Sequence, residues 1–431
     1  MAPILRFHFD FSCPFAYLAS TQIERVAEDA GATLRLRPFL LGGVFRARGV
    51  AQNLASTLSP PKAAHNLADM HRHAALFDVP FAMPEGHPFR TVTALRALLV
   101  VDAAGAPMGP LMHAIYRAYW VDGVDISDDD ALRSVLAGVA PGARADLDPD
   151  AILAQTQASG IKQRLRDLTD EALELGIFGA PAMVVRSRGP FGDEPEGDTL
   201  FWGQDRLPWV RQALGLAPEP IPAPTPMAPV EVWFDYSSPF TYIAVERARR
   251  FLGDAIVWRP MLLGAVFKAL GGPIVPLHTF SEAKRAYADR DMRRQAKEAD
   301  VPFVWPSRFP LRTVLALRAT LHVLGTPELA DRAEALIHRI FRLCWADDGD
   351  PADPAAIAAC CDDVGLPGAD IVAACATPEV KHQLFAATDA AVARGVFGAP
   401  TFVVAPDGAD PQLFWGNDRL PLAARQARES L

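Results

Sequence analysis

Hydrophobic and polar residues follow one series of strand and helix patterns that occurs twice along the chain. In the first half the predicted elements are a strand at 4–9, a helix at 14–30, a strand at 33–38, amphipathic helices over much of 60–176, strands near 182–186 and 199–202, and a helix from about 206. The second half repeats this order. A short strand–helix–strand piece and a strand–strand–helix piece, separated by helices, indicate a thioredoxin-like α/β fold with a helical insertion.

Five short blocks of sequence return in the same order in the second half. They are His8 to Phe15 with Trp233 to Phe240, Arg37 to Gly42 with Arg259 to Gly264, Arg90 to Val92 with Arg312 to Val314, Gly176 to Pro181 with Gly395 to Pro400, and Phe201 to Pro208 with Phe414 to Pro421. The displacement falls from 225 to 213 residues along the chain, as expected when a duplicated domain acquires small insertions and deletions. We therefore predict two tandem copies of one domain.

Alternating prolines mark the boundary between the copies. Residues 218–229 are too rich in proline for a helix and favour an extended spacer. The predicted domains are 1–217, with a helical insertion at about 45–176, and 230–431, with an insertion at about 267–394.

Composition excludes several classes of partner. The net charge is −9 with acids and bases interleaved, so neither nucleic acid nor a membrane surface is an expected partner. The N-terminus shows no export signal and no apolar run is long enough to span a bilayer, which predicts a cytoplasmic protein. The five cysteines lack metal-ligand spacing, and the four in the second half are expected to be buried apolar residues. No metal is expected.

The first candidate site lies at the turn after the first strand of each copy. Cys13-Pro14 and Ser238-Pro239 place a thiol or hydroxyl at the N-cap of a helix. Free N–H groups and the positive end of the helix dipole there are expected to lower the pKa of the Cys13 thiol. Ser238 is equally explained as an ordinary N-cap, and a buried inert Cys13 remains open. Neither copy has a second cysteine three residues later, which argues against a dithiol oxidase.

Two further motifs precede strands and helices late in each copy. Ala180-Pro181 and Ala399-Pro400 open a strand, where a cis bond would turn the preceding backbone groups outward to pair with an extended peptide; a simple turn is the alternative. Gln204-Asp205 and Asn417-Asp418 precede the last helix. They either cap that helix or hold an α-amino acid end through an amide and a carboxylate.

Together these motifs resemble the 2-hydroxychromene-2-carboxylate isomerase family, which belongs with the kappa-class glutathione transferases in the DsbA-type thioredoxin superfamily. The resemblance covers nearly the whole chain twice and implies glutathione as cofactor. It also implies a small aromatic carboxylate as substrate and a place in aromatic catabolism. The residue that activates glutathione maps onto Ser238 and, substituted, onto Cys13. The residues implied to hold the cysteinyl part of glutathione are Ala180, Pro181, Ala399 and Pro400, and those implied to hold its γ-glutamyl end are Gln204, Asp205, Asn417 and Asp418.

The implied reaction is an isomerisation in which the glutathione thiolate adds to a conjugated ring-opened substrate and is later eliminated. The substrate is expected between the thioredoxin part and the helical insertion, with Phe267, Trp305 and Trp345 as possible lining residues. Relatives act as dimers, so the fused chain resembles an intramolecular pseudo-dimer, and further oligomerisation is left open. The alternatives are a glutathione transferase or monothiol disulfide oxidoreductase that uses Cys13, and a noncatalytic glutathione- or small-molecule-binding protein.

Overall fold

The chain folds into two compact units that each contain a four-stranded sheet. The computed structural model describes residues 2–53, 55–221, 223, 225–405 and 410–430. Unit 1 comprises Met1–Thr57, Asn66–Pro220 and Ser281–Lys284, and unit 2 comprises Leu58–His65, Ile221–Phe280 and Arg285–Leu431. The predicted domains are contiguous, with 58–65 in the first copy and 281–284 in the second. In the structure, 58–65 belongs to unit 2 and 281–284 to unit 1. Pro222 and Pro224 of the predicted linker, together with the two terminal residues, lie outside the described residues.

The elements of the first half follow the predicted order. The strands are β1 (Ile4–Phe9), β2 (Thr33–Pro38), β3 (Ala182–Ser187) and β4 (Gly197–Trp202). The α-helices are α1 (Pro14–Asp29), α2 (Leu41–Ala47), α3 (Pro60–Leu76), α4 (Val92–Ala103), α5 (Met108–Trp120), α6 (Asp129–Gly138), α7 (Pro149–Gln155), α8 (Ser159–Glu174) and α9 (Leu207–Ala213). Short 3₁₀ helices are η1 (Ala55–Thr57), η2 (Pro141–Arg144) and η3 (Gln204–Arg206).

The elements of the second half repeat this series. The strands are β5 (Val230–Phe234), β6 (Ile256–Pro260), β7 (Thr401–Val404) and β8 (Gln412–Trp415). The α-helices are α10 (Pro239–Leu252), α11 (Leu263–Ala269), α12 (Glu282–Glu298), α13 (Val314–Gly325), α14 (Ala333–Trp345), α15 (Pro354–Asp363), α16 (Gly368–Ala374), α17 (Pro378–Ala393) and α18 (Leu420–Glu429). The 3₁₀ helices are η4 (Pro276–Thr279), η5 (Ala330–Arg332) and η6 (Asn417–Arg419).

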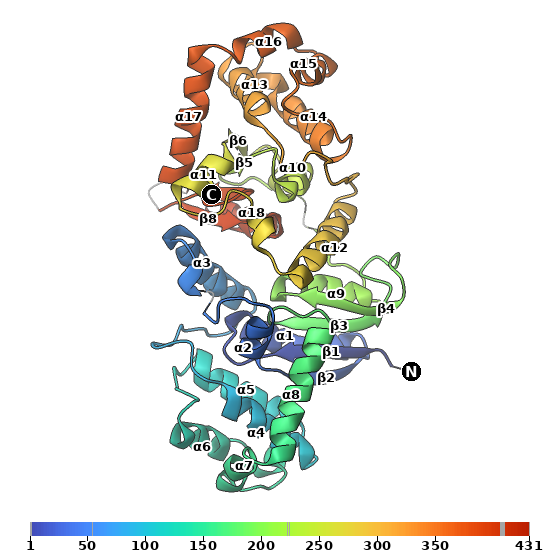
Figure 1. The fold of residues 1–431 in the computed structure, drawn as a ribbon, viewed down its shortest axis with the longest axis vertical. Helices are drawn as coiled ribbons and strands as arrows, with labels where there is room; N and C mark the ends of the chain where they lie inside the picture. Colours follow the sequence, from blue (N-terminus) through green and yellow to red (C-terminus); the bar gives the residue numbers. More distant parts are fainter. Residues whose placement is uncertain (1, 54, 222, 224, 406–409, 431) are drawn as a thin grey trace. The chain divides into compact units, whose positions relative to one another are not determined.

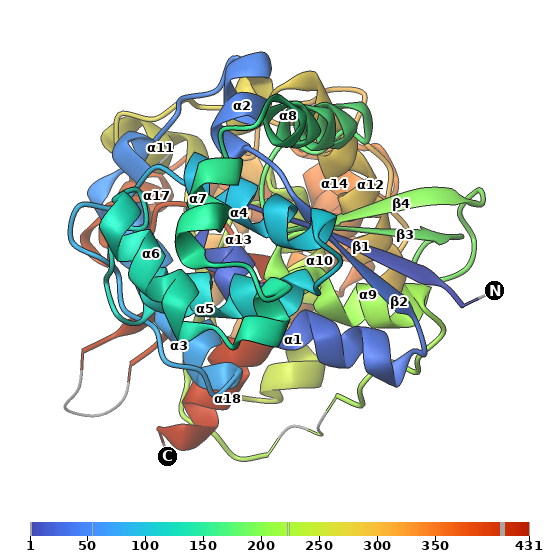
Figure 2. The same cartoon turned by 90° about the horizontal axis from the view of Figure 1, so that it is seen from below.

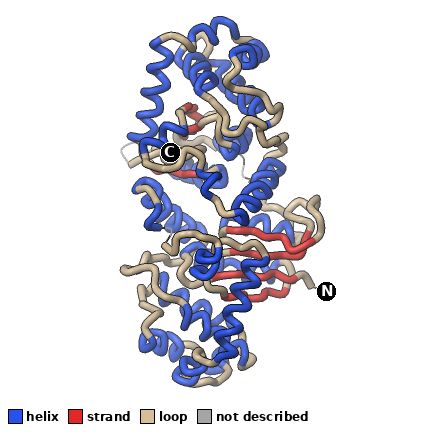
Figure 3. Tube along the Cα trace, in the orientation of Figure 1, coloured by secondary structure: helices blue, strands red, loops and turns tan. Residues whose placement is uncertain are grey.

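Both sheets have the same mixed topology. The strand order in unit 1 is β2-β1-β3-β4, in which β1 is parallel to β2 and antiparallel to β3, and β3 is antiparallel to β4. Unit 2 repeats it as β6-β5-β7-β8. Figure 2 shows the four strands of unit 1 fanning out with a twist, and Figure 3 shows the same strands in red. The predicted α/β fold with two thioredoxin-like domains is confirmed.

A group of helices forms the insertion of each unit. In unit 1, α4, α5, α6 and α7 pack on one another, and α8 runs back from this group to the sheet (Figure 1). In unit 2, α13 packs against α14, α15, α16 and α17. A buried tryptophan joins each insertion to the loop after the first strand, because Trp120 Nε1 donates to the Phe11 carbonyl at 2.8 Å and Trp345 Nε1 to the Tyr236 carbonyl at 2.8 Å. The insertions are thereby fixed against the predicted active turns.

Apolar packing accounts for the remaining sequence expectations about the core. Cys344, Cys360, Cys361 and Cys375 are all buried, as predicted for apolar residues of the insertion. Burial raises the pKa of each of these thiols above its usual range.

Within the described part of the chain, no helix combines the length and the apolar character that crossing a bilayer requires.

His8 is a buried titratable residue on the central strand β1 of unit 1. Its side chain is fully buried on β1, and neither ring nitrogen has a hydrogen-bond partner in the described structure. Burial, followed by the charges of Arg6 and Arg37, lowers the pKa of His8 from 6.5 to about 3. The folded state therefore holds a neutral imidazole at pH values where the unfolded chain is protonated.

We expect unit 1 to lose stability as the pH falls from about 6.5 towards 3, because over this range the unfolded state binds one more proton at His8. The contribution is at most about 1.4 kcal/mol for each pH unit. Replacing His8 with phenylalanine should remove this part of the acid sensitivity. Urea unfolding at pH 7.5 and pH 5 measures it, and an unchanged acid sensitivity in the variant would show that His8 is not the responsible group.

Candidate functional site

The sequence motifs of each unit meet at one end of its sheet. Because β1 is antiparallel to β3, the C-terminal end of β1 lies beside the N-terminal end of β3, where His8 pairs with Ala182. The last residue of β4, Trp202, pairs with Ala182 as well. In unit 2, Trp233 pairs with Thr401, and Thr401 with Trp415. The N-terminus of α10, the Ala399-Pro400 turn and the loop after β8 thus surround the same sheet end.

Ser238 caps α10 and contacts the turn before β7. Its Oγ accepts from the backbone N–H of Thr241 at 3.2 Å and donates to the Ala399 carbonyl at 2.9 Å. The Ala399-Pro400 peptide bond is cis, as is Ala180-Pro181 in unit 1. Ser238 is therefore both the N-cap that its residue type favours and a hydroxyl held at the residue preceding the cis-proline.

Cys13 occupies the position in unit 1 that corresponds to Ser238, but its side-chain contacts and its pKa differ from what the sequence predicts. Its Sγ donates to the Ala180 carbonyl at 3.1 Å, and it makes no side-chain capping bond to α1. The prediction of a lowered pKa is wrong. Burial raises the pKa of the Cys13 thiol to about 12, which outweighs the backbone N–H groups of Ala16 and Phe15 at the helix terminus. A thiol in this environment is protonated at neutral pH.

A buried carboxyl group outside the predicted site residues connects the segments that form the site. In unit 2, Asp235 accepts from the N–H of Ser237 at 2.9 Å, the N–H of Leu263 at 2.8 Å and Thr313 Oγ1 at 2.7 Å. Burial raises the pKa of the Asp235 carboxyl, and these hydrogen bonds act in the opposite direction. Asp235 joins the turn before α10, the start of α11 and the start of α13. Its repetition within the motif was the available sequence signal.

Asp10 makes the corresponding bonds in unit 1. It accepts from the N–H of Ser12 at 3.0 Å and from the N–H of Leu41 at 2.8 Å, and Thr91 also donates to its side chain. The repeated Arg-Thr-Val block thus contains the threonine that closes this network in each unit.

Close packing explains the glycine in each Phe-Gly-Ala-Pro motif. A Cβ placed on Gly179 would lie 2.7 Å from Trp202 Nε1, and one placed on Gly398 would lie within van der Waals overlap of the Trp415 indole. The same tryptophans pack on the motif's phenylalanine, with ring centroids 4.8 Å apart for Phe178 and Trp202. A tryptophan at the end of β4 or β8 therefore shapes the turn before the cis-proline.

The late Gln-Asp and Asn-Asp pairs lie just before the last helix of each unit, in short 3₁₀ helices. They lie in η3 and η6, and the N-cap residues of α9 and α18 are Arg206 and Arg419, without side-chain capping bonds. Neither pair therefore occupies the N-cap position of the last helix. Gln204 and Asn417 are buried, whereas Asp205 and Asp418 are partly exposed.

A polar chain inside unit 2 fixes the Asn417 amide. Asn417 Nδ2 donates to Gln295 Oε1, Gln295 Nε2 donates to Asp291, and Tyr287 donates to Asp291 at 3.1 Å. Because η6 also packs against α10, this chain places an amide and the Asp418 carboxylate near the helix that begins after Ser238.

A cavity of about 420 Å³ opens beside this site in unit 2. It is lined mostly by apolar side chains from the start of α11, the loop that follows it and the start of α13, and by Asp235 and Ser237. It lies between the thioredoxin part and the insertion, where the substrate is predicted. The predicted lining residues are wrong: Trp345 is fully buried in the core of the insertion, and Phe267 and Trp305 pack against core clusters outside the cavity wall.

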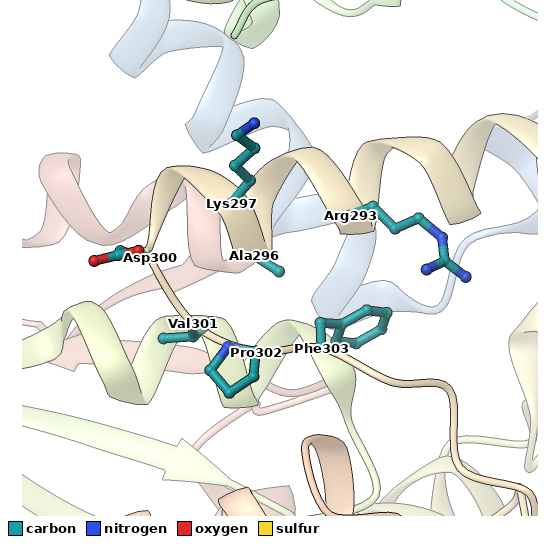
Figure 4. A pocket seen from close by; sticks show the side chains of 7 residues that line it. All are labelled: Arg293, Ala296, Lys297, Asp300, Val301, Pro302 and Phe303. Atoms are coloured by element: carbon teal, nitrogen blue, oxygen red, sulfur yellow. The ribbon is translucent and has the colours of Figure 1, made fainter. Parts of the chain in front are cut away.

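A second depression of about 460 Å³ lies at the C-terminal end of α12, away from these motifs. Figure 4 shows Lys297 pointing away from the loop that carries Pro302 and Phe303, while Arg293 extends sideways along the helix. Its charged groups do not converge on one point, so it is a weaker candidate for a binding site than the cavity beside Ser237.

Comparisons with known proteins identify the domain family. The model of the DSBA-like thioredoxin domain matches residues 4–215 and 229–427. The 2-hydroxychromene-2-carboxylate isomerase of Sphingobium xenophagum is 31% identical over 195 residues, which cover 44% of this chain and 93% of that protein. The protein of the same name from Pseudomonas sp. (strain C18) is 28% identical over 217 residues, or 50% of this chain and 92% of that protein.

A eukaryotic relative shows the same coverage. Human glutathione S-transferase kappa 1 is 28% identical over 211 residues, which cover 45% of this chain and 88% of that protein. Each of these relatives is covered almost in full by about half of the chain, as expected if the chain carries a tandem duplication. The chain belongs to the DSBA-like thioredoxin domain family, carries two such domains in tandem, and is similar over each relative's length to enzymes named isomerases and kappa-class transferases.

Proposed function

We propose that the chain is a glutathione-dependent isomerase of the 2-hydroxychromene-2-carboxylate type, with its active site in unit 2. The observation that carries the proposal is the Ser238 hydroxyl, which lies at the N-terminus of α10 and 2.9 Å from the carbonyl before the cis-proline. A hydroxyl at a positive helix end is suited to donate to a thiolate. The apolar cavity beside Ser237 supplies a concave place for an aromatic substrate.

The donor set of unit 2 fits glutathione. Ala399 would pair with the backbone of its cysteinyl part, and Asn417 with Asp418 would hold its γ-glutamyl end, where an amide and a carboxylate meet the ammonium and carboxylate groups. Ser238 Oγ would turn its proton from the Ala399 carbonyl towards the sulfur. When bound, glutathione supplies a nucleophilic thiolate for reversible addition to a conjugated double bond. Unit 2 would contribute the orientation of the cofactor and the hydroxyl donor.

The thiol of unit 1 favours the isomerase over the redox alternative. With a pKa of about 12, the Cys13 thiol has almost no thiolate at neutral pH, and only the thiolate attacks a disulfide. We therefore infer that Ala180, Pro181, Gln204 and Asp205 of unit 1 form a site with the same shape but without the same activity. The fused chain then acts as a pseudo-dimer with one competent domain.

Titration calorimetry with glutathione tests the proposal. We expect the wild-type chain to bind glutathione and Ser238→Ala to bind it about ten- to a hundredfold more weakly, because a hydrogen bond to a charged group contributes about 1.5–3 kcal/mol. Cys13→Ala should keep the wild-type affinity. Mass spectrometry of the complex should show no covalent adduct at Cys13. Absence of glutathione binding by the wild-type chain would refute the proposal.

A further inference from the structure

Two arginines bring positive charge to the cavity beside Ser237. Arg312 stands directly before Thr313 at the start of α13, and Arg318 lies within the same helix. Both side chains line the cavity, the first exposed and the second half-buried. The only acid that lines the cavity is Asp235, within the part of unit 2 that the structure describes.

Neither arginine is neutralised by a residue that the structure describes. No ion pair or hydrogen bond joins Arg312 or Arg318 to another described residue, and the Nε atom of Arg318 is buried without a partner. The carboxyl group of Asp235 is already occupied by Ser237, Leu263 and Thr313. A buried guanidinium N–H without an acceptor is costly in a folded protein, and an anion bound in the cavity would supply this acceptor to Arg318 Nε.

The repeat places two arginines at the equivalent positions of unit 1. Arg90 and Arg96 are the counterparts of Arg312 and Arg318, with the same separation along the chain. Arg96 Nε is likewise buried without a partner in the described structure. Two copies that differ at most positions therefore both contain an arginine whose Nε atom is buried without a partner in the described structure.

We propose that Arg318, with Arg312 at the mouth of the cavity, binds the carboxylate of a conjugated aromatic acid and sets the specificity of unit 2 for an anionic substrate. This inference rests on the proposed function. A guanidinium group presents paired N–H donors that match the two oxygens of a carboxylate, while the apolar wall accommodates the ring. The bound carboxylate would orient the conjugated chain of the substrate towards the Ser237-Ser238 turn.

The test uses the full chain, with trans-2-hydroxycinnamate as the anionic probe and its uncharged amide as the matched neutral probe. We expect wild type to bind the carboxylate more tightly than the amide. Arg318→Met should weaken carboxylate binding about ten- to a hundredfold and leave amide binding within about twofold, because only the charge-assisted hydrogen bonds are lost. Arg318→Lys should fall between the two. Arg342→Met, which removes an exposed arginine elsewhere on unit 2, controls for net charge.

The outcomes separate this inference from the proposed function. If Arg318→Met weakens binding of both probes equally, the loss comes from packing and the assignment is overturned. Unchanged carboxylate binding in Arg318→Met, or no carboxylate binding by wild type, would also overturn it. Glutathione affinity is measured on the same variants and should stay within about twofold of wild type. A chain that binds the carboxylate through Arg318 but does not bind glutathione would refute the isomerase proposal and support the anion site.

Discussion

Replacing Asp235 with alanine is expected to destabilise unit 2 by about 3–5 kcal/mol and to abolish binding at its site. The change leaves the N–H groups of Ser237 and Leu263 and the hydroxyl of Thr313 without their acceptor in a buried environment. Each unsatisfied donor costs about 1–3 kcal/mol. Because these donors belong to the turn before α10, the start of α11 and the start of α13, their release would also open the cavity wall.

Differential scanning calorimetry and urea unfolding measure this effect. Asp10→Ala is the matched control, since it removes the corresponding carboxyl group of unit 1. The two variants should each destabilise a different unit, which hydrogen exchange assigns. Asp254→Ala, at a side chain that is 97% exposed, should leave both units unchanged. A loss below about 1 kcal/mol in Asp235→Ala would contradict the role of this group as the anchor of the loops.

The second large effect is expected in catalysis. Ser238→Ala should lower kcat/KM for glutathione-dependent isomerisation about 10²- to 10³-fold, the range measured when one donor to a developing anion is removed. The loss comes from the missing hydroxyl and not only from the missing N-cap, which contributes about 1 kcal/mol to stability. Stopped-flow or steady-state assays of a chromene carboxylate at saturating glutathione measure it.

Two control variants separate catalysis from capping. Ser238→Thr keeps a hydroxyl that both caps and donates, so it should retain activity within about tenfold of wild type. Ser238→Asp keeps a capping oxygen but no proton at neutral pH, so it should stay folded and lose activity. Full activity in Ser238→Asp would show that the hydroxyl proton is not needed.

Much of the fold follows directly from the sequence because it depends on local patterns. Period-two alternation gives the first strand as Ile4–Phe9, and proline at the first helical position begins α1 at Pro14 and α10 at Pro239. The duplication supplied an internal check, since each element was expected twice. The convergence of the motifs also follows from topology, because an antiparallel neighbour brings the start of one strand to the end of another.

The remaining features depend on burial, which residue spacing does not encode. The helix terminus near Cys13 favours a thiolate, but desolvation is the larger effect and raises its pKa to about 12. Phe267 in α11, Trp345 in α14 and Trp305 in the loop before α13 all pack on core clusters, although residue type alone made them aromatic candidates for the cavity wall. In the sequence, Asp235 and Arg318 are marked only by their repetition in the other copy. The role of Asp235 depends on hydrogen-bond donors from distant segments, and that of Arg318 on an Nε atom left without an acceptor.

The contact between Gly398 and the Trp415 indole has a consequence for variation among relatives. A glycine that leaves no room for a methyl group requires the Phe-Gly-Ala-Pro motif and the tryptophan of β8 to change together. Homologues with a side chain at the glycine should carry a smaller residue at the tryptophan, and chimeras that exchange only one of the two segments should misfold at the turn. Grafting this site onto another thioredoxin-like scaffold therefore requires both segments to move together.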